Sequence, residues 1–315
     1  MNMDKLYESV KQNGHVCVGL DTCIDYVPSL EKENYKKKAE DALSWSKDWV
    51  MYGEGFDECA CNAHAVFAFN KALIDTTCDV CACYKVQIAY YEQMGLSGLK
   101  AYSETLKYIR SKGCLSIADI KRGDIADTAV RYAKGHFSGD FEADFVTLSP
   151  YMGMDSIEPW LNEARDRGKG AFVLMRTSNK GMRDFQYLNV NDQSKKVYNV
   201  LGDKMAYLAA QNCGNSGYGM FGVVVGCTER DEAAAIRKNY PNLFFLIPGY
   251  GAQGGGAQDA ALLLREGNGG VVNASRSIIT AWQKAQGAEK ADNVFAADEA
   301  RRAVIKMRDE IREVL

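Results

Sequence analysis

The sequence predicts an α/β fold, a closed (β/α)8 barrel in which eight parallel strands are surrounded by helices. Eight short apolar runs recur along the 315 residues, and each is followed by a stretch with helical periodicity. This alternation is typical of parallel strands joined by crossover helices. The length suits one large barrel with insertions, and 47% hydrophobic residues are enough for a large core. A doubly wound open sheet is the alternative fold that the same runs allow.

The predicted strands are unevenly spaced along the chain. They are residues 15–20, 80–84, 114–118, 144–148, 170–175, 220–225, 243–247 and 269–272. About sixty residues separate the first two, so we expect a helical insertion at about 31–76, between strands 1 and 2. No Pro-rich or Ser-rich linker interrupts this interval, and residues 1–315 are therefore expected to form a single domain.

Helical spacing is clearest in two segments. After the second strand, apolar residues recur at intervals of three and four with one longer gap, namely Ile88, Tyr91, Leu99, Tyr102, Leu106 and Ile109. Gly95, Gly98 and Gly113 are expected to interrupt or end this helix. Near the C-terminus, Val304, Met307 and Ile311 repeat the pattern.

The balance of charge excludes some classes of partner. The chain has 38 Lys and Arg residues against 41 Asp and Glu, and a net charge of -3 gives no overall basic field for nucleic acid or an anionic membrane surface. No apolar run approaches the ~18 residues of a membrane span. Residues 1–14 also lack the apolar segment that a secretory signal needs. We therefore expect a cytoplasmic protein.

Ten cysteines are too few for a disulfide scaffold in a chain of this length, and they suit a reducing compartment. Five of them gather within residues 59–83 and include a C-x-x-C element, which raises the alternative of a zinc site. Cys81 and Cys83 also fit an apolar strand, where cysteine behaves as a small hydrophobic residue. We favour the strand and expect no metal.

The densest charge pattern follows the third predicted strand, where Asp119, Lys121 and Asp124 lie close together in the sequence. Side chains alternate along a strand, so Asp119 and Lys121 should share a face at the end where barrel active sites lie. Asp124 can return to them from the loop. Because buried charges need partners, we expect an Asp-Lys-Asp network in which two carboxylates raise the lysine pKa and keep it protonated. A solvated loop with surface salt bridges is the alternative.

Two other predicted strand ends carry charges. Lys85 and Gln87 follow the second strand, and Asp21 follows the first. The C-terminal ends of parallel barrel strands meet at one mouth, so these side chains should join Asp119 and Lys121 in one constellation.

A glycine-rich loop, residues 248–256, follows the seventh predicted strand and precedes the helical run 260–265. Its glycines would let backbone N–H groups approach a phosphate, and the helix that follows would add its dipole. Arg276, after the eighth strand, has the fork geometry that suits phosphate. The segment lacks the G-x-x-x-x-G-K-[ST] pattern of a nucleotide P-loop. A flexible surface loop is the alternative.

These residues resemble the orotidine 5'-phosphate decarboxylase family, in its longer second group with helical insertions before the second strand. The resemblance is carried by the D-x-K-x-x-D run from Asp119 to Asp124, with Asp21 and Lys85 before it and 248–256 and Arg276 after it. It implies a TIM barrel, a homodimer with active sites at the subunit interface, and conversion of orotidine 5'-phosphate to UMP and CO2 without a cofactor. Orotate phosphoribosyltransferase, which acts one step earlier, becomes a candidate partner.

The resemblance also implies roles for individual residues. The catalytic set would be Lys85, Asp119, Lys121 and Asp124, with Asp124 reaching into the partner's site. The substrate-binding set would be Asp21, Gln87, Ile125, Thr128, Thr177, Ser178, Pro248, Gln253 and Arg276. Within it, Asp21 and Lys85 would hold the ribose hydroxyls, Ile125 and Thr128 would come from the partner, Thr177 or Ser178 would read the pyrimidine, and Gln253 and Arg276 would bind the phosphate.

The residue types suit that chemistry. Loss of CO2 from C6 of the pyrimidine leaves a carbanion without the electron sink that pyridoxal phosphate or thiamine provides. Lys121 can stabilise charge at C6 and then deliver the proton, while Asp119 would repel the substrate carboxylate.

Three other functions are open to such a barrel. A 3-keto-gulonate-phosphate decarboxylase type shares the D-x-K-x-x-D element but uses magnesium, and the long insertion and glycine-rich loop disfavour it. A Schiff-base aldolase would need Lys85 or Lys121 as a neutral amine, which flanking carboxylates oppose. A barrel kept only for binding would be expected to show gaps in the charged set, and none is seen.

Overall fold

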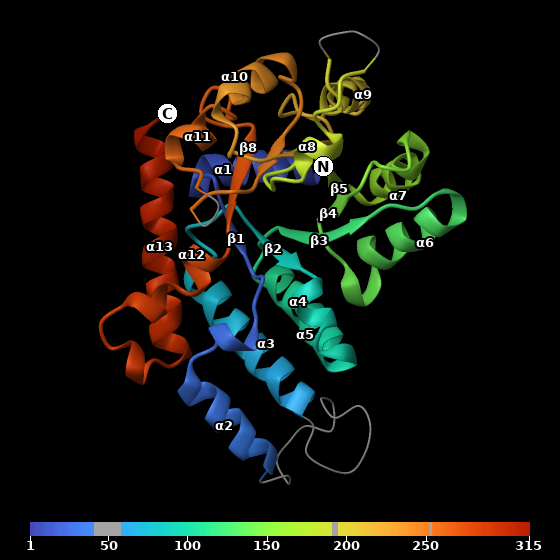
Figure 1. Ribbon diagram of the computed structural model, residues 1–315. Helices are drawn as coiled ribbons and strands as arrows, with labels where there is room; N and C mark the ends of the chain where they lie inside the picture. The colour runs from blue at the N-terminus through green and yellow to red at the C-terminus, as the bar shows by residue number, and fades with distance from the viewer. Residues whose placement is uncertain (41–57, 191–194, 252–253) are drawn as a thin grey trace.

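The computed structural model describes residues 1–40, 58–190, 195–251 and 254–315, and these contain a closed barrel of eight parallel strands (Figure 1). Each strand pairs with its neighbours in chain order, and the last pairs with the first. The open sheet is therefore excluded. The strands are β1 Val16–Gly19, β2 Cys83–Gln87, β3 Ser116–Arg122, β4 Phe145–Leu148, β5 Gly170–Arg176, β6 Phe221–Val225, β7 Phe245–Ile247 and β8 Gly270–Ala274.

Helices surround the barrel, as the periodicity predicts. The described α-helices are α1 Asn2–Asn13, α2 Ser29–Glu40, α3 Glu58–Thr77, α4 Ala89–Glu92, α5 Gly95–Ser111, α6 Ala126–Phe137, α7 Glu158–Arg167, α8 Met182–Phe185, α9 Val197–Gln211, α10 Arg230–Asn239, α11 Ala257–Ala261, α12 Arg276–Ile279 and α13 Asn293–Glu313. Short 3-10 turns lie at Ile24–Tyr26, Gly139–Phe141, Met154–Ser156, Ala281–Lys284 and Ala288–Lys290. Of the segment about 31–76, the structure describes α2 and α3, while residues 41–57 lie outside the described part. No helix in the described ranges is long and apolar enough to cross a membrane.

Both segments with clear helical spacing are helical in the structure. The helix expected after the second strand is split into α4 and α5 at Gly95, whose φ is 61°. A left-handed residue breaks the helical path there, and glycine adopts it without a side-chain clash. Val304, Met307 and Ile311 are buried on α13, which confirms the predicted C-terminal helix.

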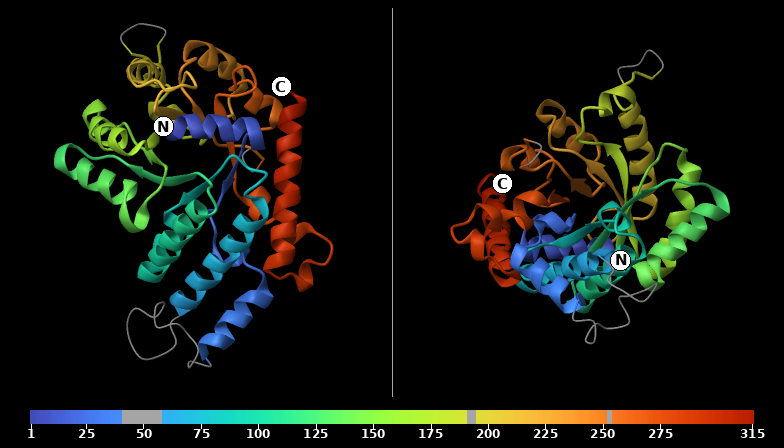
Figure 2. Two further views of the ribbon diagram at one scale, coloured as in Figure 1. Left: turned by 180° about the vertical axis from the view of Figure 1, so that it is seen from behind. Right: turned by 60° about the horizontal axis from the view of Figure 1, so that its bottom comes forward.

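Helix α1 closes the end of the barrel where the strands begin (Figure 2). Its apolar residues Met3, Leu6 and Val10 are buried in one cluster with inward-facing strand residues such as Ile117 and Phe145. A second and larger cluster fills the space between the strands and the outer helices. With one end closed, the opposite end of the barrel is left for a site.

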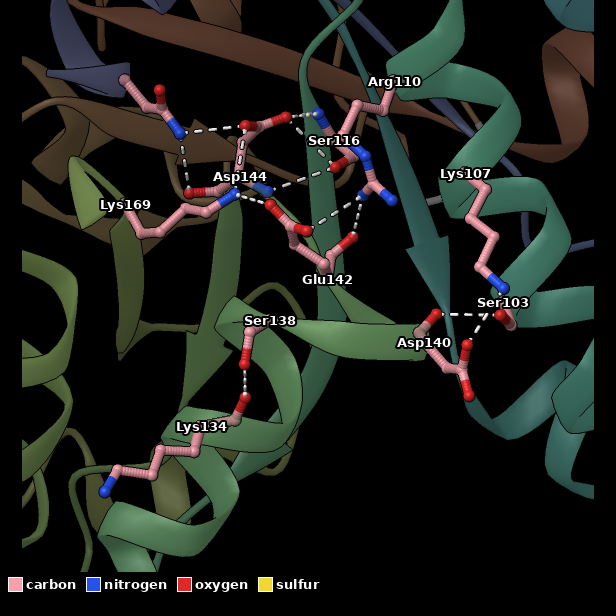
Figure 3. Close-up of polar contacts among 11 residues, drawn as sticks. Ser103, Lys107, Arg110, Ser116, Lys134, Ser138, Asp140, Glu142, Asp144 and Lys169 are labelled. Atoms are coloured by element: carbon pink, nitrogen blue, oxygen red, sulfur yellow. Dashed lines mark hydrogen bonds and ion pairs between the residues drawn. The ribbon is translucent and has the colours of Figure 1, made fainter.

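An ion cluster around the buried Lys169 also lies at the end where the strands begin (Figure 3). Lys169 Nζ lies 2.9 Å from Glu142 Oε1 and 3.7 Å from Asp144 Oδ1. Arg110 donates to the Glu142 backbone carbonyl at 2.9 Å, and its side chain lies 3.9 Å from the Glu142 carboxylate. Asn2 of α1 donates to Asp144 at 2.9 Å. We call Arg110, Glu142, Asp144 and Lys169 the basal cluster.

Two strands continue further than their apolar runs predict. The second strand begins at Cys83 rather than residue 80, so Lys85 and Gln87 lie within it. The third runs through Arg122 instead of ending at 118, so Asp119 and Lys121 are also strand residues. Charged residues interrupt the apolar pattern, but the backbone pairing continues because these charges find partners inside the barrel mouth.

Candidate active site

A cavity of about 390 Å³ opens where the strands end. Seven of the eight strands contribute side chains to it, and this end of the strands is the usual position of active sites in such barrels. It is lined by Asp21, Lys85, Gln87, Tyr90, Asp119, Lys121, Thr147, Leu174, Thr177, Ser178, Asn179, Val224, Leu246, Pro248 and Asn273. The structure therefore brings together eight of the thirteen predicted site residues.

Four charged side chains form a continuous chain along the wall of this cavity. Lys85 Nζ lies 3.0 Å from Asp21 Oδ1 and 2.9 Å from Asp119 Oδ2. The other oxygen of Asp119 lies 2.6 Å from Lys121 Nζ. Lys85 and Asp119 are almost completely buried, whereas the Lys121 side chain is 47% exposed. We call Asp21, Lys85, Asp119 and Lys121 the active-site cluster.

The alternating charges of the cluster determine the protonation states of Lys85 and Asp119. Burial alone would lower the pKa of Lys85, but the charges of Asp119 and Asp21 outweigh it and raise the pKa above its ordinary value. Burial alone would raise the pKa of Asp119, but Lys85 and Lys121 hold it well below the usual range. Lys85 is therefore an ammonium and Asp119 a carboxylate at neutral pH. The sequence predicts a lysine between two carboxylates, and within one chain that lysine is Lys85.

Asp21 is held by the neighbouring strand end. Ser275 Oγ donates to Asp21 Oδ2 at 2.8 Å, while Lys85 occupies the other carboxylate oxygen. Ser275 also passes very close to β1, since a side chain at Gly19 would put its Cβ 1.9 Å from Ser275 Oγ. Gly19 is thus required for the close approach that joins β1 to the end of β8.

The segment after β5 forms another wall of the cavity. Thr177 Oγ1 donates to Asn179 Oδ1 at 2.6 Å and accepts from Gln186 Nε2 at 2.9 Å. Behind it, the fully buried Arg176 donates to the backbone carbonyls of Gly226 and Glu229. Since the Thr177 hydroxyl is already engaged on both sides, Ser178 is better placed to offer its hydroxyl to a ligand.

The structure places residues of the predicted phosphate site in two different cavities. Pro248 lines the main cavity, but Arg276 lines a second cavity of about 490 Å³ together with Gly251 and Lys284. Gly249 and Gly251 have φ values of 105° and 71°, which glycine adopts readily. Gln253 lies outside the described residues. The helix expected at 260–265 is the five-residue α11, which begins at Ala257.

Three predicted residues stay away from the cavity of their own chain. Asp124 accepts a hydrogen bond from its neighbour Ile125 at 2.9 Å, and Ile125 and Thr128 are exposed. Within the described residues, the carboxylate that contacts Lys121 is Asp119 and not Asp124. The predicted network of Asp119, Lys121 and Asp124 is therefore not formed within one chain.

Sequence reasoning missed seven residues that line the cavity. Six of them lie on or just after predicted strands, namely Leu174, Val224, Leu246, Thr147, Asn273 and Asn179, and strict alternation along each strand could have found the first three. The seventh is Tyr90, which lies on α4. Thr147 is a polar residue in an otherwise apolar strand, which is a signal of a special role.

The chain is similar over its full length to known decarboxylases. The model of the orotidine 5'-phosphate decarboxylase / HUMPS family matches residues 60–291. The orotidine 5'-phosphate decarboxylase of Clostridium acetobutylicum is 52% identical over 316 residues, which cover 100% of both chains. That of Clostridium perfringens strain SM101 is 50% identical over 315 residues, covering 100% of this chain and 99% of the relative.

A solved structure supports the same assignment. The Leishmania donovani OMP decarboxylase superposes with a TM-score of 0.69 at 29% identity, covering 99% of this chain and 97% of that one. The fold and the full-length sequence similarity therefore agree. The chain belongs to the orotidine 5'-phosphate decarboxylase / HUMPS family and is a decarboxylase, a carbon–carbon lyase.

Proposed function

We propose that the protein converts orotidine 5'-phosphate to UMP and CO2 in de novo pyrimidine biosynthesis, without a cofactor. The observation that carries the proposal is the active-site cluster, which lies on the wall of a substrate-sized cavity with Lys121 at its open end. Full-length relatives that bear the name of this decarboxylase support the choice of substrate over a 3-keto-gulonate phosphate.

The proposed mechanism uses Lys121 as the proton donor. Decarboxylation would leave a carbanion at C6, and an ammonium held 2.6 Å from Asp119 can stabilise that charge and then protonate it. Asp119 stays ionised because two lysines face it, so it would repel the substrate carboxylate and regain a favourable environment as CO2 departs. Lys85 keeps Asp119 charged and in place through its 2.9 Å contact.

The rest of the cavity would bind the nucleotide. Asp21 and Lys85 would hold the ribose hydroxyls, Ser178 would read the pyrimidine, and Gln87 and Thr177 would complete this wall. Pro248 would line the nucleotide cavity, and Gln253 and Arg276 would bind the phosphate, which is remote from the broken bond. Binding energy gained at the phosphate can hold the charged groups in place for the reaction.

We also propose that two copies of the chain share their active sites. Asp124, Ile125 and Thr128 do not line the cavity of their own chain, and Ile125 is 42% exposed. Other large exposed apolar side chains follow β4 and β5, namely Tyr151, Met152 and Phe185. A second copy packed on these residues would cover them and could bring its Asp124 to Lys121, which would complete the Asp-Lys-Asp arrangement. Residues 1–315 would then act as one barrel domain per subunit.

The decisive experiment is a decarboxylation assay on the purified protein with EDTA present. We expect loss of CO2 from orotidine 5'-phosphate to continue at an undiminished rate. Activity that disappears with EDTA, or that appears only with 3-keto-gulonate 6-phosphate and magnesium, would favour the rival decarboxylase. Borohydride trapping of substrate on Lys85 or Lys121 would favour the aldolase.

Shared sites can be tested by mixing inactive subunits. Asp124→Asn and Lys121→Ala chains, unfolded together and refolded, should regain about a quarter of the wild-type sites if half of the dimers are mixed and each mixed dimer has one intact site. No recovery in a dimer shown to be mixed would contradict the shared site. Orotate phosphoribosyltransferase remains a proposed partner, which co-sedimentation with this protein would test.

A further inference from the structure

Thr147 lies at an irregularity in the pairing of the two strands that build the active-site cluster. Strand β3 pairs with β4 at Ala118↔Val146 and next at Arg122↔Leu148. Three residues of β3, from Asp119 to Lys121, therefore face the single residue Thr147 on β4. Such a bulge breaks the regular ladder of backbone hydrogen bonds and redirects side chains near active sites.

The Thr147 side chain replaces the missing ladder. Its Oγ1 accepts hydrogen bonds from the backbone N–H groups of Ile120 and Lys121, each at 3.0 Å. The same hydroxyl donates to Asp119 Oδ1 at 2.8 Å, the oxygen that also contacts Lys121 Nζ. One buried hydroxyl, with its residue only 1% exposed, thus fixes the backbone of Lys121 and the carboxylate that holds its ammonium.

The backbone at Lys121 needs such support. Its φ is 45°, and it is one of three described residues other than glycine with a positive φ. A side chain in this left-handed region has a higher energy than in the ordinary regions, so surrounding contacts must maintain it. The next residues are tied to β4 as well, since Ser149 N donates to the Arg122 carbonyl at 2.8 Å. Thr147 is the β4 residue whose side chain bonds directly to the backbone N–H of Lys121.

We propose that Thr147 is a positioning residue for the decarboxylation step, whose hydroxyl holds Lys121 and Asp119 in their reactive geometry. The inference rests on the proposed function and deepens it. Thr147 lines the cavity, but all its hydrogen-bonding capacity is used within the protein. Its effect on the reaction is therefore exerted through its two neighbours. The proposal predicts that the hydroxyl matters and that the methyl group does not.

Three variants separate these contributions. Thr147→Val keeps the shape and removes the hydroxyl, Thr147→Ala removes both groups, and Thr147→Ser keeps the hydroxyl alone. A hydrogen bond to a charged group contributes enough that we expect kcat to fall roughly 10- to 100-fold in the valine and alanine variants. We expect KM to change less than about threefold, because the groups that hold the ribose and phosphate lie elsewhere. The serine variant should restore kcat to within about threefold of the wild type.

A matched control removes a buried threonine hydroxyl at a different place. Thr77 on α3 is fully buried, donates to the Leu73 carbonyl at 2.6 Å and contacts the Tyr84 hydroxyl at 2.7 Å. Thr77→Val should lower the urea midpoint of unfolding without lowering kcat. All variants are compared at urea concentrations well below their midpoints, so that a loss of folded protein is not read as a loss of kcat. Thr147→Ala serves as the hydroxyl-free variant if Thr147→Val does not fold.

A second measurement does not depend on turnover. Amide hydrogen exchange at Ile120 and Lys121 should become at least about tenfold faster in the hydroxyl-free variants and return toward wild type in Thr147→Ser. Normal kcat without the hydroxyl, a serine variant as slow as valine, or an equal loss of kcat in Thr77→Val would each overturn the inference. A wild-type protein without decarboxylase activity would refute the proposed function instead. Unchanged exchange at the two amides would then still overturn the role of Thr147.

Discussion

The two ends of the barrel each contain a buried lysine between two carboxylates, yet the two clusters are built for different tasks. In the active-site cluster, Lys85 lies 3.0 Å from Asp21 and 2.9 Å from Asp119. In the basal cluster, Lys169 lies 2.9 Å from Glu142 and 3.7 Å from Asp144. Each cluster has two cations and two anions, so formal charge does not distinguish them.

The basal cluster is closed by contacts to the rest of the fold. Asp144 accepts from the Ser116 backbone at 3.0 Å and from Asn2, while Arg110 lies beside Glu142 (Figure 3). These contacts join α1, α5, β3 and the starts of β4 and β5. Charged groups that are held by several contacts within the protein contribute order rather than reactivity.

The active-site cluster is open at one end. Lys121 has a half-exposed side chain, three donor hydrogens and one protein carboxylate within the described residues of its own chain. Its backbone is in the left-handed region, whereas the three other members of the cluster are not among the described positive-φ residues. The two clusters therefore differ in having or lacking a half-exposed, strained member at a cavity, and not in the presence of buried ion pairs.

The largest predicted difference between the two ends is in catalysis. Lys121→Ala should lower kcat by about 10³-fold or more, since it removes the proposed proton donor and its charge. The free energy of unfolding should change by no more than ~1 kcal/mol, because the side chain is half exposed. Stopped-assay kinetics and urea unfolding measure the two effects. Normal turnover in this variant would refute the proton-donor role. The control is Lys169→Ala in the basal cluster, for which we expect an unchanged kcat.

The second difference is in stability. Lys169→Ala leaves Glu142 and Asp144 facing each other without their lysine, and we expect the free energy of unfolding to fall by about 3 kcal/mol. The urea midpoint should decrease while the m-value stays constant. A loss below ~1 kcal/mol would show that solvent replaces the lysine and that the basal cluster is not closed.

The third difference appears on acidification. Burial alone would raise the pKa of Glu142, but Lys169 lowers it, and Asp119 has a pKa held far lower by Lys85 and Lys121. Below the ordinary carboxylate pKa near 4, the unfolded chain therefore binds more protons than the folded one, so stability falls as pH falls toward the folded values. The contribution of Asp119 is on the order of 2 kcal/mol.

Urea unfolding between pH 5 and the acid limit of folding tests whether Asp119 contributes more to the pH dependence of stability than Glu142 does. Asp119→Asn should flatten the dependence of stability on pH more than Glu142→Gln does. Carboxyl NMR should also show Glu142 protonating at a higher pH than Asp119. The reverse order would mean that the basal cluster is the more strongly coupled of the two.

The sequence predicts the barrel well because its apolar runs report burial directly. It locates strand ends poorly, since Lys85 and Asp119 interrupt the apolar pattern although β2 and β3 continue through them. The same charges nevertheless make Asp21, Lys85, Asp119 and Lys121 recognisable as a site, and the structure brings all four together.

Other features depend on contacts that no local pattern reveals. The role of Thr147 arises from a shift in register between two strands, and Ser275 reaches Asp21 only because β8 closes the barrel against β1. The basal cluster is equally hidden, since its members come from α5 and from the starts of β4 and β5, where surface charges are common. Long-range pairing therefore decides which polar residues work together.

The smallest predicted effect concerns the loss of a single hydroxyl group at each end of the barrel. Ser116, which contacts the basal cluster, is 1% exposed, and its Oγ accepts from the Asp144 backbone at 3.2 Å and contacts the Asp144 carboxylate at 3.3 Å. Ser116→Ala should cost about 1 kcal/mol of unfolding free energy and leave kcat unchanged, because it weakens a closed cluster far from the cavity. Thr147→Ala should do the opposite and affect kcat more than stability. If Ser116→Ala slowed turnover as much as Thr147→Ala, the two ends of β3 would be coupled, and the separation of stability from reactivity would fail.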